Sequence, residues 1–253
     1  MMRIFDSHAH YDDPRFDEDR ENLLSTLPSR GVEGIITCGT NVATSEASLA
    51  IAEKYPYIKA ACGIYPGEAL KIAPGDFARL AELLKDENCV ALGEIGLEYH
   101  YDDVPREIQL DCFEKQLKMA AYTGKPVIIH DREAHDDTLR LLKKYQPRGV
   151  LHCYSGSVEM LKEIVKLEMY IGLGGAVTFK NAKKPVEAAK AVPLDLLLLE
   201  TDAPYMTPVP HRGKRNDSSY IPYAAEVIAE ARGLDAETVC AVTAENAKRL
   251  FGI

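Results

Sequence analysis

The sequence predicts a single (β/α)8 TIM barrel that spans residues 1–253. Short apolar runs with strand character recur along the chain, and helix-like stretches separate them. Strands that alternate with helices pair in parallel, and α/β barrels of roughly 200 to 250 residues form one domain. Eight strands are expected, over residues 4–8, 34–38, 58–64, 90–95, 127–130, 150–153, 170–173 and 196–200.

The intervals between these runs carry helical patterns. Leu110, Phe113, Leu117 and Ala121 keep the spacing that buries one face of a helix. Residues 221–232 and 235–251 are expected to form two closing helices after the last strand, beyond a Pro-rich loop. An open doubly wound sheet is the alternative, but its Gly-x-Gly-x-x-Gly fingerprint does not follow the first strand.

Composition places the chain among ordinary globular proteins. Hydrophobic residues make up 46% and charged residues 27% of the chain, which excludes a disordered or fibrous class. The start of the chain lacks the apolar stretch of a signal peptide, and no run of about 18 apolar residues occurs, so we expect a cytoplasmic protein without a membrane span. The net charge of −9 disfavours a broad basic surface for nucleic acid and leaves room for a local one.

The cysteines predict reduced core residues and no disulfide framework. The six cysteines include no Cys-x-x-Cys pair, and most stand beside apolar residues. Cys153 follows His152 directly, so it could be a nucleophile or a soft metal ligand, although packing is the commoner role of such a cysteine.

Six side chains that can bind a metal stand where five of the predicted strands end. His8 and His10 are two residues apart, so both point to the same face of an extended segment. The carboxyl ends of barrel strands carry the functional side chains, and a buried polar cluster there is costly unless it binds a cation. The sequence therefore predicts a metal centre made of His8, His10, Glu94, His130, His152 and Asp202.

This set of donors predicts one or two divalent cations. Imidazole and carboxylate ligands suit Zn, Mn or Fe and tolerate Mg, and six donors exceed the needs of one tetrahedral zinc. We assign His8 and His10 to one ion, His130 and His152 to the other, and Glu94 to both as a bridge. Asp202 would hold or deprotonate the attacking water. Glu94 and Asp202 are thus the expected catalytic residues of a hydrolase.

Cationic residues near the end of the chain are the expected substrate contacts. The only dense basic run is His211, Arg212, Lys214, Arg215 and Asn216, with Gly213 inside it. Arg132 could clamp a phosphate with two hydrogen bonds, or form an ordinary ion pair with Glu133 or Asp131. His100 and His135 lie in polar surroundings and are expected to face solvent.

Six ordered motifs resemble the TatD family of metal-dependent deoxyribonucleases, among the amidohydrolase-like metallo-hydrolases. The resemblance covers nearly the whole chain and rests on residues 6–10, 93–97, 126–132, 152–156, 200–205 and 212–216. It implies a TIM barrel, one or two divalent cations and hydrolysis of phosphodiester bonds. For some members, 3′ to 5′ exonuclease action on single-stranded or damaged DNA is described, so DNA, as single strands or 3′ ends, is the implied partner.

The chain departs from the family pattern at three places. Tyr65 and Gly67 stand where the family usually has two histidines, Asp217-Ser218 replaces the usual Glu-Pro, and Glu98 replaces an Asp. The lost imidazoles leave a second hypothesis open, a metal-dependent hydrolase of a small ester, lactone or amide. The acidic charge leaves a third, a non-catalytic barrel that binds metal or a protein partner.

Overall fold

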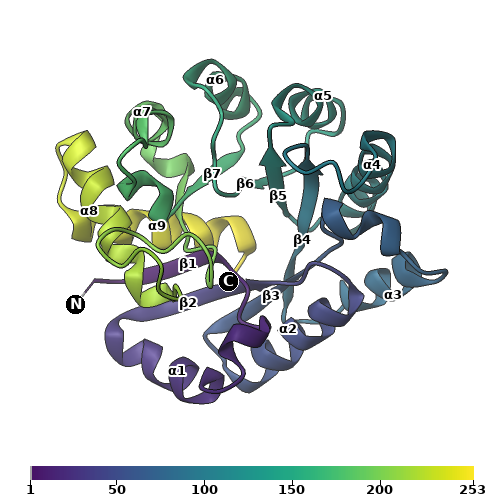
Figure 1. Cartoon of the computed structure of the whole chain (residues 1–253), viewed down its shortest axis with the longest axis horizontal. Coiled ribbons are helices and arrows are strands. Elements are labelled where there is room, and N and C mark those ends of the chain that lie inside the picture. The colour runs from purple at the N-terminus through teal and green to yellow at the C-terminus, as the bar shows by residue number, and fades with distance from the viewer. Residues whose placement is uncertain (1) are drawn as a thin grey trace.

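The computed structural model describes residues 2–253, and in them eight parallel strands pair in chain order from β1 to β8 (Figure 1). The strands are β1 (Ile4–Ala9), β2 (Val32–Cys38), β3 (Ile58–Cys62), β4 (Cys89–Glu98), β5 (Val127–Arg132), β6 (Gly149–Leu151), β7 (Tyr170–Leu173) and β8 (Leu197–Leu199). All eight predicted strands are present, so the predicted barrel is confirmed.

Strand limits differ most where the site lies. β6 ends at Leu151, so His152 follows the strand instead of lying inside the predicted range of 150–153. β8 ends at Leu199, one residue before its predicted end, and Asp202 follows it as expected. β4 is longer than expected, because its last residues pair with β5 as far as Glu98 opposite Arg132. Glu94 therefore lies near the middle of the strand, instead of near its predicted end.

Helices surround the strands as an outer layer (Figure 1). They are α1 (Arg20–Thr26), α2 (Val42–Lys54), α3 (Asp76–Leu83), α4 (Arg106–Thr123), α5 (His135–Tyr145), α6 (Val158–Lys166), α7 (Lys183–Ala191), α8 (Ile221–Arg232) and α9 (Ala236–Phe251). The two closing helices are confirmed, with Asp235 as the N-cap of α9. α9 packs against β1 and β8. Short 3-10 turns join the elements, including η3 (Pro66–Lys71) and η6 (Ser218–Tyr220).

The predicted buried face of α4 was partly wrong. Phe113 and Leu117 are buried, but Ala121 is exposed and Leu110 is only half-buried. The buried face is rotated because Gln109 and Gln116 belong to it. The Gln116 amide accepts from the Ile64 N–H at 2.8 Å and donates to the Ile64 carbonyl at 2.9 Å. Because these two buried positions are polar, the spacing of apolar residues alone does not indicate the buried face of α4.

Between β1 and β8 the barrel is closed by side chains and by a short backbone pairing just beyond β8. In that pairing the Asp202 N–H donates to the His8 carbonyl at 2.9 Å and the His10 N–H donates to the Ala203 carbonyl at 2.7 Å. Ser7 donates to the Leu199 carbonyl at 2.9 Å, and beyond β8 a single bridge pairs Ala9 with Ala203. The fully buried Asp6 carboxylate accepts from the Thr201 N–H at 3.0 Å and from the hydroxyls of Thr201 and Ser218, both at 2.6 Å. These contacts fix the segment that carries Asp202.

Replacing Asp6 by Asn should change how stability depends on pH. Burial raises the pKa of Asp6 to about 6, although its hydrogen bonds offset part of the shift. An acid whose pKa is raised in the folded state costs stability once the pH exceeds its unfolded pKa of 3.8, and the cost levels off above about 6. Asn keeps the acceptor oxygen and removes the buried charge.

The Asp6→Asn variant should therefore gain about 2 kcal/mol relative to wild type between about pH 4.5 and about pH 7.5. Urea unfolding at a series of pH values measures this difference. A stability difference that does not vary with pH would contradict the charged state assigned to Asp6.

All six cysteines are free, and five of them are buried, as the sequence predicted. Among residues 2–253, no helix combines the length and the apolar character that crossing a bilayer requires.

Candidate metal centre

Five strands bring the six predicted ligands to one end of the barrel. His8 lies in β1 and His10 directly after it, Glu94 lies in β4 and His130 in β5. His152 follows β6, and Asp202 stands three residues after β8. His8, His10, Glu94 and His152 are buried, and the other two are partly buried. Distant parts of the chain thus meet in one cluster.

The first group of ligands is formed by the histidines of β1 and the two acids. His8 Nε2 lies 3.1 Å from His10 Nε2. Glu94 Oε2 lies 3.6 Å from His8 Nε2 and 3.3 Å from His10 Nε2. Asp202 Oδ1 lies 3.6 Å and 3.5 Å from the same two nitrogens. Four donor atoms therefore surround one small volume.

The second group uses the other oxygen of Glu94. Glu94 Oε1 lies 2.8 Å from His130 Nδ1 and 3.0 Å from His152 Nε2, and these two nitrogens are 3.2 Å apart. His8, His10 and Glu94 form one set of converging ligand atoms, and Glu94, His130 and His152 form another. A third set joins His8, His152 and Asp202. Glu94 connects the two groups, in the arrangement that the sequence predicted for a bridging carboxylate.

The remaining nitrogens of two imidazoles are occupied by acceptors. His10 Nδ1 lies 2.7 Å from the Cys38 carbonyl, and His130 Nε2 lies 3.2 Å from Glu98 Oε2. A carbonyl or carboxylate accepts a proton from the ring, so the opposite nitrogen of each neutral imidazole offers its lone pair to the cluster. This orientation is the one that metal-ligating histidines adopt.

The charges of the cluster also fit a cation. Burial alone would raise the pKa of Glu94, but the histidines around it lower that pKa well below its usual range. Burial would likewise lower the pKa of His130, but hydrogen bonds to Glu94 and Glu98 raise it to about 9. The carboxylates thus stay ionised and require positive charge beside them. Protonated imidazoles supply this positive charge when no metal is bound, and a divalent ion would supply it in the same place.

The backbone around Asp202 is held in an uncommon conformation. Asp202 has a φ of 56°, in the left-handed region that few side chains adopt. The Asn216 amide donates to the carbonyls of Thr201 and Tyr205, at 2.9 Å and 2.7 Å, and so braces this segment. Strained residues held by their surroundings cluster at functional sites.

The predicted basic run divides into exposed and engaged residues. Arg212 and Lys214 are exposed, although the Arg212 guanidinium lies 4.0 Å from the centre of the Phe179 ring and donates to the Thr207 carbonyl at 2.9 Å. Arg215 makes two hydrogen bonds of 2.7 Å to Asp19, and the His211 ring nitrogen lies 2.8 Å from the Tyr223 hydroxyl.

The prediction that Asn216 contacts substrate needs correction. Asn216 is 0% exposed, so its side chain has no surface for a ligand in this structure. Its polar side chain suggested a contact within the basic run, but its amide is used to hold the backbone instead.

Other polar predictions had mixed outcomes. Arg132 is exposed, and its side chain lies 3.9 Å from the carboxylate of Glu98 instead of forming the alternative ion pair with Glu133 or Asp131. His100 is exposed as predicted, and it pairs with Glu133. The prediction for His135 was wrong, because this residue is half-buried at the start of α5 and its Nδ1 lies 2.7 Å from Asp131.

Cys153 fits the packing interpretation better than a reactive one. Burial and then the neighbouring carboxylate of Glu200 raise the pKa of the Cys153 thiol well above its usual range. A thiol in that state is a poor nucleophile, since the thiolate is the reactive form. Its thiol also belongs to none of the ligand groups within residues 2–253.

Four residues at the site escaped the sequence analysis as contributors: Glu98, Tyr65, Tyr205 and Arg15. Glu98 lies behind His130, and Tyr65 donates a hydrogen bond of 3.3 Å to Glu98. Tyr205 is 48% exposed, and its ring centre lies 6.4 Å from that of His10. Arg15 lies over the Tyr205 ring at 3.9 Å. These side chains come from loops or from the extension of β4, and no periodic pattern marks such positions.

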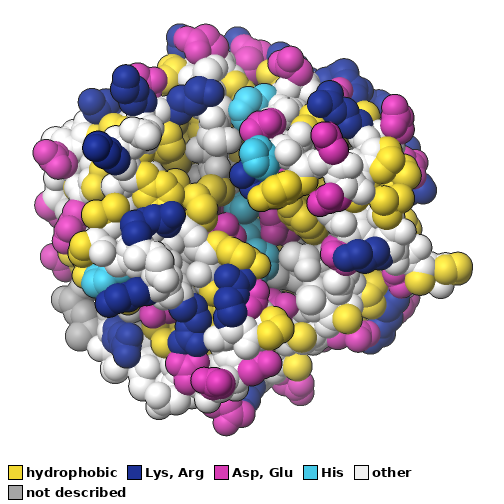
Figure 2. Space-filling view, in the orientation of Figure 1, with side chains coloured by type: hydrophobic (Ala, Val, Ile, Leu, Met, Phe, Trp, Pro, Cys, Tyr) yellow, Lys and Arg dark blue, Asp and Glu magenta, His cyan; other side chains and the backbone are white. Residues whose placement is uncertain are grey.

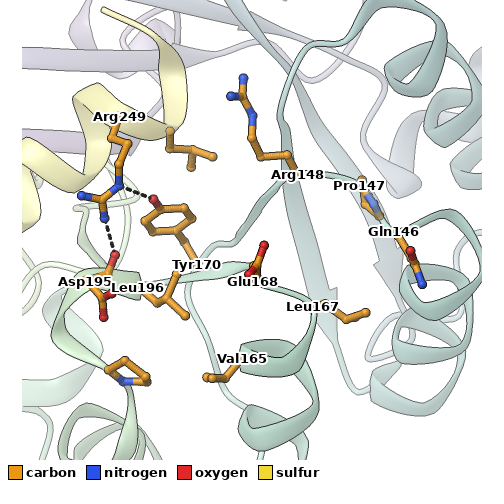
Figure 3. A pocket seen from close by; sticks show the side chains of 12 residues that line it. Gln146, Pro147, Arg148, Val165, Leu167, Glu168, Tyr170, Asp195, Leu196 and Arg249 are labelled. Carbon is orange, nitrogen blue, oxygen red and sulfur yellow. Dashed lines mark hydrogen bonds between the residues drawn. The ribbon is translucent and has the colours of Figure 1, made fainter.

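Figure 2 shows histidine side chains at the bottom of a hollow near the middle of this face, with Lys and Arg side chains along one side. A second cavity, of about 670 Å³, lies where β6 and β7 begin and beside α9 (Figure 3). There Arg249 donates to the Tyr170 hydroxyl at 3.0 Å and to the Asp195 carbonyl at 2.6 Å. Its lining contains no histidine or cysteine. The metal chemistry therefore belongs to the central hollow.

Comparison with known proteins agrees with this geometry. Residues 5–252 match the family model described as TatD related DNase. The chain is 42% identical over 253 residues to the uncharacterized metal-dependent hydrolase YabD of Bacillus subtilis (strain 168), with 99% of each chain covered. It is 33% identical over 261 residues to the 3′-5′ ssDNA/RNA exonuclease TatD of Escherichia fergusonii, again with 99% of each covered.

Solved structures show the same relationship. The crystal structure of YjjV, a TatD homolog from Escherichia coli K12, superposes with a TM-score of 0.94 at 34% identity and covers 100% of this chain and 99% of its own. The barrel and its ligand cluster define a metal-dependent hydrolase of the (β/α)8 class. With the match over nearly its full length, the chain belongs to the TatD family.

Proposed function

We propose that this protein is a divalent-metal-dependent phosphodiesterase that removes nucleotides from the 3′ ends of single-stranded nucleic acid, with DNA as the first substrate to test. The main support is the Glu94 carboxylate. One oxygen lies 3.3 Å from His10 and the other 2.8 Å from His130. A carboxylate shared in this way suits a centre of two ions about 3.5 to 4 Å apart.

The donor set supplies the chemistry of a hydrolase. Divalent ions bound there would bring the pKa of water close to neutrality and stabilise the attacking and leaving oxygens of a displacement. Glu94 and the four imidazoles hold the positive charge in place. Asp202 Oδ1, 3.5 Å from His10 Nε2, is within reach of a water in the first group and holds or deprotonates it.

The rim of the hollow supports a nucleic-acid substrate. Arg212 and Lys214 offer exposed positive charge, and Arg132, also exposed, could bind a phosphate oxygen. The exposed ring of Tyr205 lies near His10, where a base of a single strand could stack. One relative bears the name of a 3′-5′ ssDNA/RNA exonuclease. A local basic rim also fits a chain whose net charge is −9.

A second candidate is hydrolysis of a small ester, lactone or amide. It is favoured by the residues of η3 and its entry, because the Tyr65 hydroxyl is engaged by Glu98 and Gly67 has no side chain to offer a phosphate. The donor set suits Zn and Mn and tolerates Mg. A cytoplasmic location stays a prediction from the sequence.

The test is hydrolysis of labelled single-stranded DNA by purified protein with Mg, Mn or Zn, before and after treatment with a chelator. We expect shortening from the 3′ end that the chelator stops and fresh metal restores, and a KM that rises with salt because phosphate contacts are screened. Turnover of small esters without any on DNA would favour the second candidate. Metal uptake without turnover on either would indicate a binding protein.

A further inference from the structure

Glu98 is a buried carboxylate behind the second ligand group and outside the six proposed ligands. It is the last residue of β4 and is only 3% exposed. Its Oε2 accepts from His130 Nε2 at 3.2 Å and from the Tyr65 hydroxyl at 3.3 Å. Its Oε1 accepts from the backbone N–H of His100 at 2.7 Å. Both oxygens are therefore engaged by fixed donors.

The main chain of Glu98 is also held on both sides. Gln109 of α4 accepts from the Glu98 N–H at 2.8 Å and donates to the Glu98 carbonyl at 2.8 Å. This contact explains why a polar residue occupies the buried face of α4. It places the carboxylate at a fixed distance from the site, as a residue that orients another side chain requires.

His130 differs from the other three imidazoles of the cluster. It turns Nδ1 toward Glu94, whereas His8, His10 and His152 turn Nε2 toward it. The second nitrogen of His10 meets a neutral carbonyl, and that of His152 has no hydrogen-bond partner within the described residues. Within residues 2–253, His130 alone in the cluster has its second nitrogen at hydrogen-bonding distance from a carboxylate.

An ion pair with Arg132 is a weaker explanation of Glu98. The nearest nitrogen of Arg132 is 3.9 Å from Glu98 Oε2, too far for a hydrogen bond, and the guanidinium is exposed. Exposed ion pairs contribute about 0 to 1 kcal/mol. The contact of Glu98 with His130, at 3.2 Å, is therefore the better explanation of why this carboxylate is buried.

We propose that Glu98 is a positioning residue for the second ion: it keeps the proton of His130 on Nε2 and holds Nδ1 toward Glu94 and His152. This inference rests on the two-ion centre proposed above. It adds a residue that touches neither ion nor substrate and acts through His130.

Replacing Glu98 by Gln should disturb this arrangement without changing the size of the side chain. In Glu98 the His100 N–H and His130 Nε2 face different oxygens. An amide has an oxygen at only one of these two positions, so it cannot accept from both donors where they stand. If its NH2 group faces His130, the imidazole must accept on Nε2 and carry its proton on Nδ1, which removes the lone pair that faces Glu94. We therefore expect weaker binding at the second group and little change at the first.

Zinc titration by calorimetry, with wild type and two variants, measures this effect. We expect two ions per wild-type chain. In Glu98→Gln, the first binding step should stay close to wild type and the second should weaken about 10- to 100-fold, the usual effect of losing such a partner. The control is Glu133→Gln, which removes one charge from a carboxylate that is 64% exposed and pairs with His100. It should bind both ions like wild type.

Nitrogen NMR of histidine in the zinc-loaded wild type gives a second readout that needs no variant to fold. The His130 ring should carry its proton on Nε2 and show a metal-shifted Nδ1. A proton on Nδ1 would overturn the role of Glu98, as would equal binding of both ions by wild type and Glu98→Gln. Wild type that takes up only one ion would overturn the two-ion centre itself, and this role with it.

Discussion

Replacing Glu94 by Gln is expected to lower kcat/KM by about a thousandfold or more. The metal ions of such sites contribute several kcal/mol of transition-state stabilisation, and each 1.36 kcal/mol is a factor of ten in rate. Glu94 Oε1 and Oε2 face different imidazole pairs. In Gln one of these atoms becomes an NH2 group, which cannot bind a cation, so one ligand group loses its acceptor and both lose the negative charge.

The same variant should also bind less metal, which links the loss of rate to the centre. Metal analysis after dialysis against a defined concentration of Mn or Zn would show fewer ions per chain than in wild type. Circular dichroism should show an intact fold, because Asp202 still faces His10 and Glu98 still faces His130. The control is Glu82→Gln, a change at a surface carboxylate that is 60% exposed and pairs with Lys85. Near-normal activity of Glu94→Gln would rule out the bridging role.

The convergence of the site could be predicted because it follows from topology. Parallel strands in a barrel bring their carboxyl ends to one face, so residues after separate apolar runs must meet there. His8, Glu94 and His130 are far apart in sequence but only a few ångströms apart in space. Their chemistry, taken together with their positions, was sufficient to predict that Glu94 lies close to both pairs of imidazoles.

The residues that hold the ligands in place could not be predicted, because their contacts depend on local geometry that leaves no periodic pattern in the sequence. β4 continues past Glu94, and only this extension brings Glu98 behind His130. Gln109 was missed because a buried polar residue breaks the apolar pattern of its helix. Asn216 looked like part of a basic run, but its amide is bonded to two backbone carbonyls. A sequence shows which groups can form hydrogen bonds and leaves their partners open.

The same limit applies to the rim. Arg215 was predicted to bind phosphate from its charge, but it already forms two hydrogen bonds to Asp19. Arg15 was not predicted, yet it lies over Tyr205 near the ligand cluster. Both outcomes depend on contacts between loops near the start of the chain and loops near its end, which are far apart in sequence. We therefore regard Lys214 and Arg212, which are exposed, as the stronger candidates for substrate contact within the basic run.

Replacing Asp202 by Asn is expected to lower kcat by about a hundredfold to ten thousandfold, the range for losing a group that accepts or orients a proton. Asp202 has a φ of 56°, in the left-handed region. Asn tolerates this backbone conformation, so the substitution should not disturb the main chain. The brace from Asn216 to Thr201 and Tyr205 does not involve the Asp202 side chain. The backbone should therefore keep its position while the carboxylate loses its charge.

The effect of Asp202→Asn should differ in kind from that of Glu94→Gln. Asp202 Oδ1 lies 3.6 Å from His8 Nε2 and 3.5 Å from His10 Nε2, and Glu94 Oε2 reaches the same two nitrogens. Asp202 also converges with His8 and His152, but the set made of Glu94, His130 and His152 does not include it. The variant should therefore retain the ion of the second group, and its KM for DNA should change little while kcat falls. Steady-state kinetics together with metal analysis separate the two cases. A wild-type kcat of Asp202→Asn with a full complement of metal would contradict this role. Another group would then have to hold the attacking water, and Asp202 would take no part in the reaction.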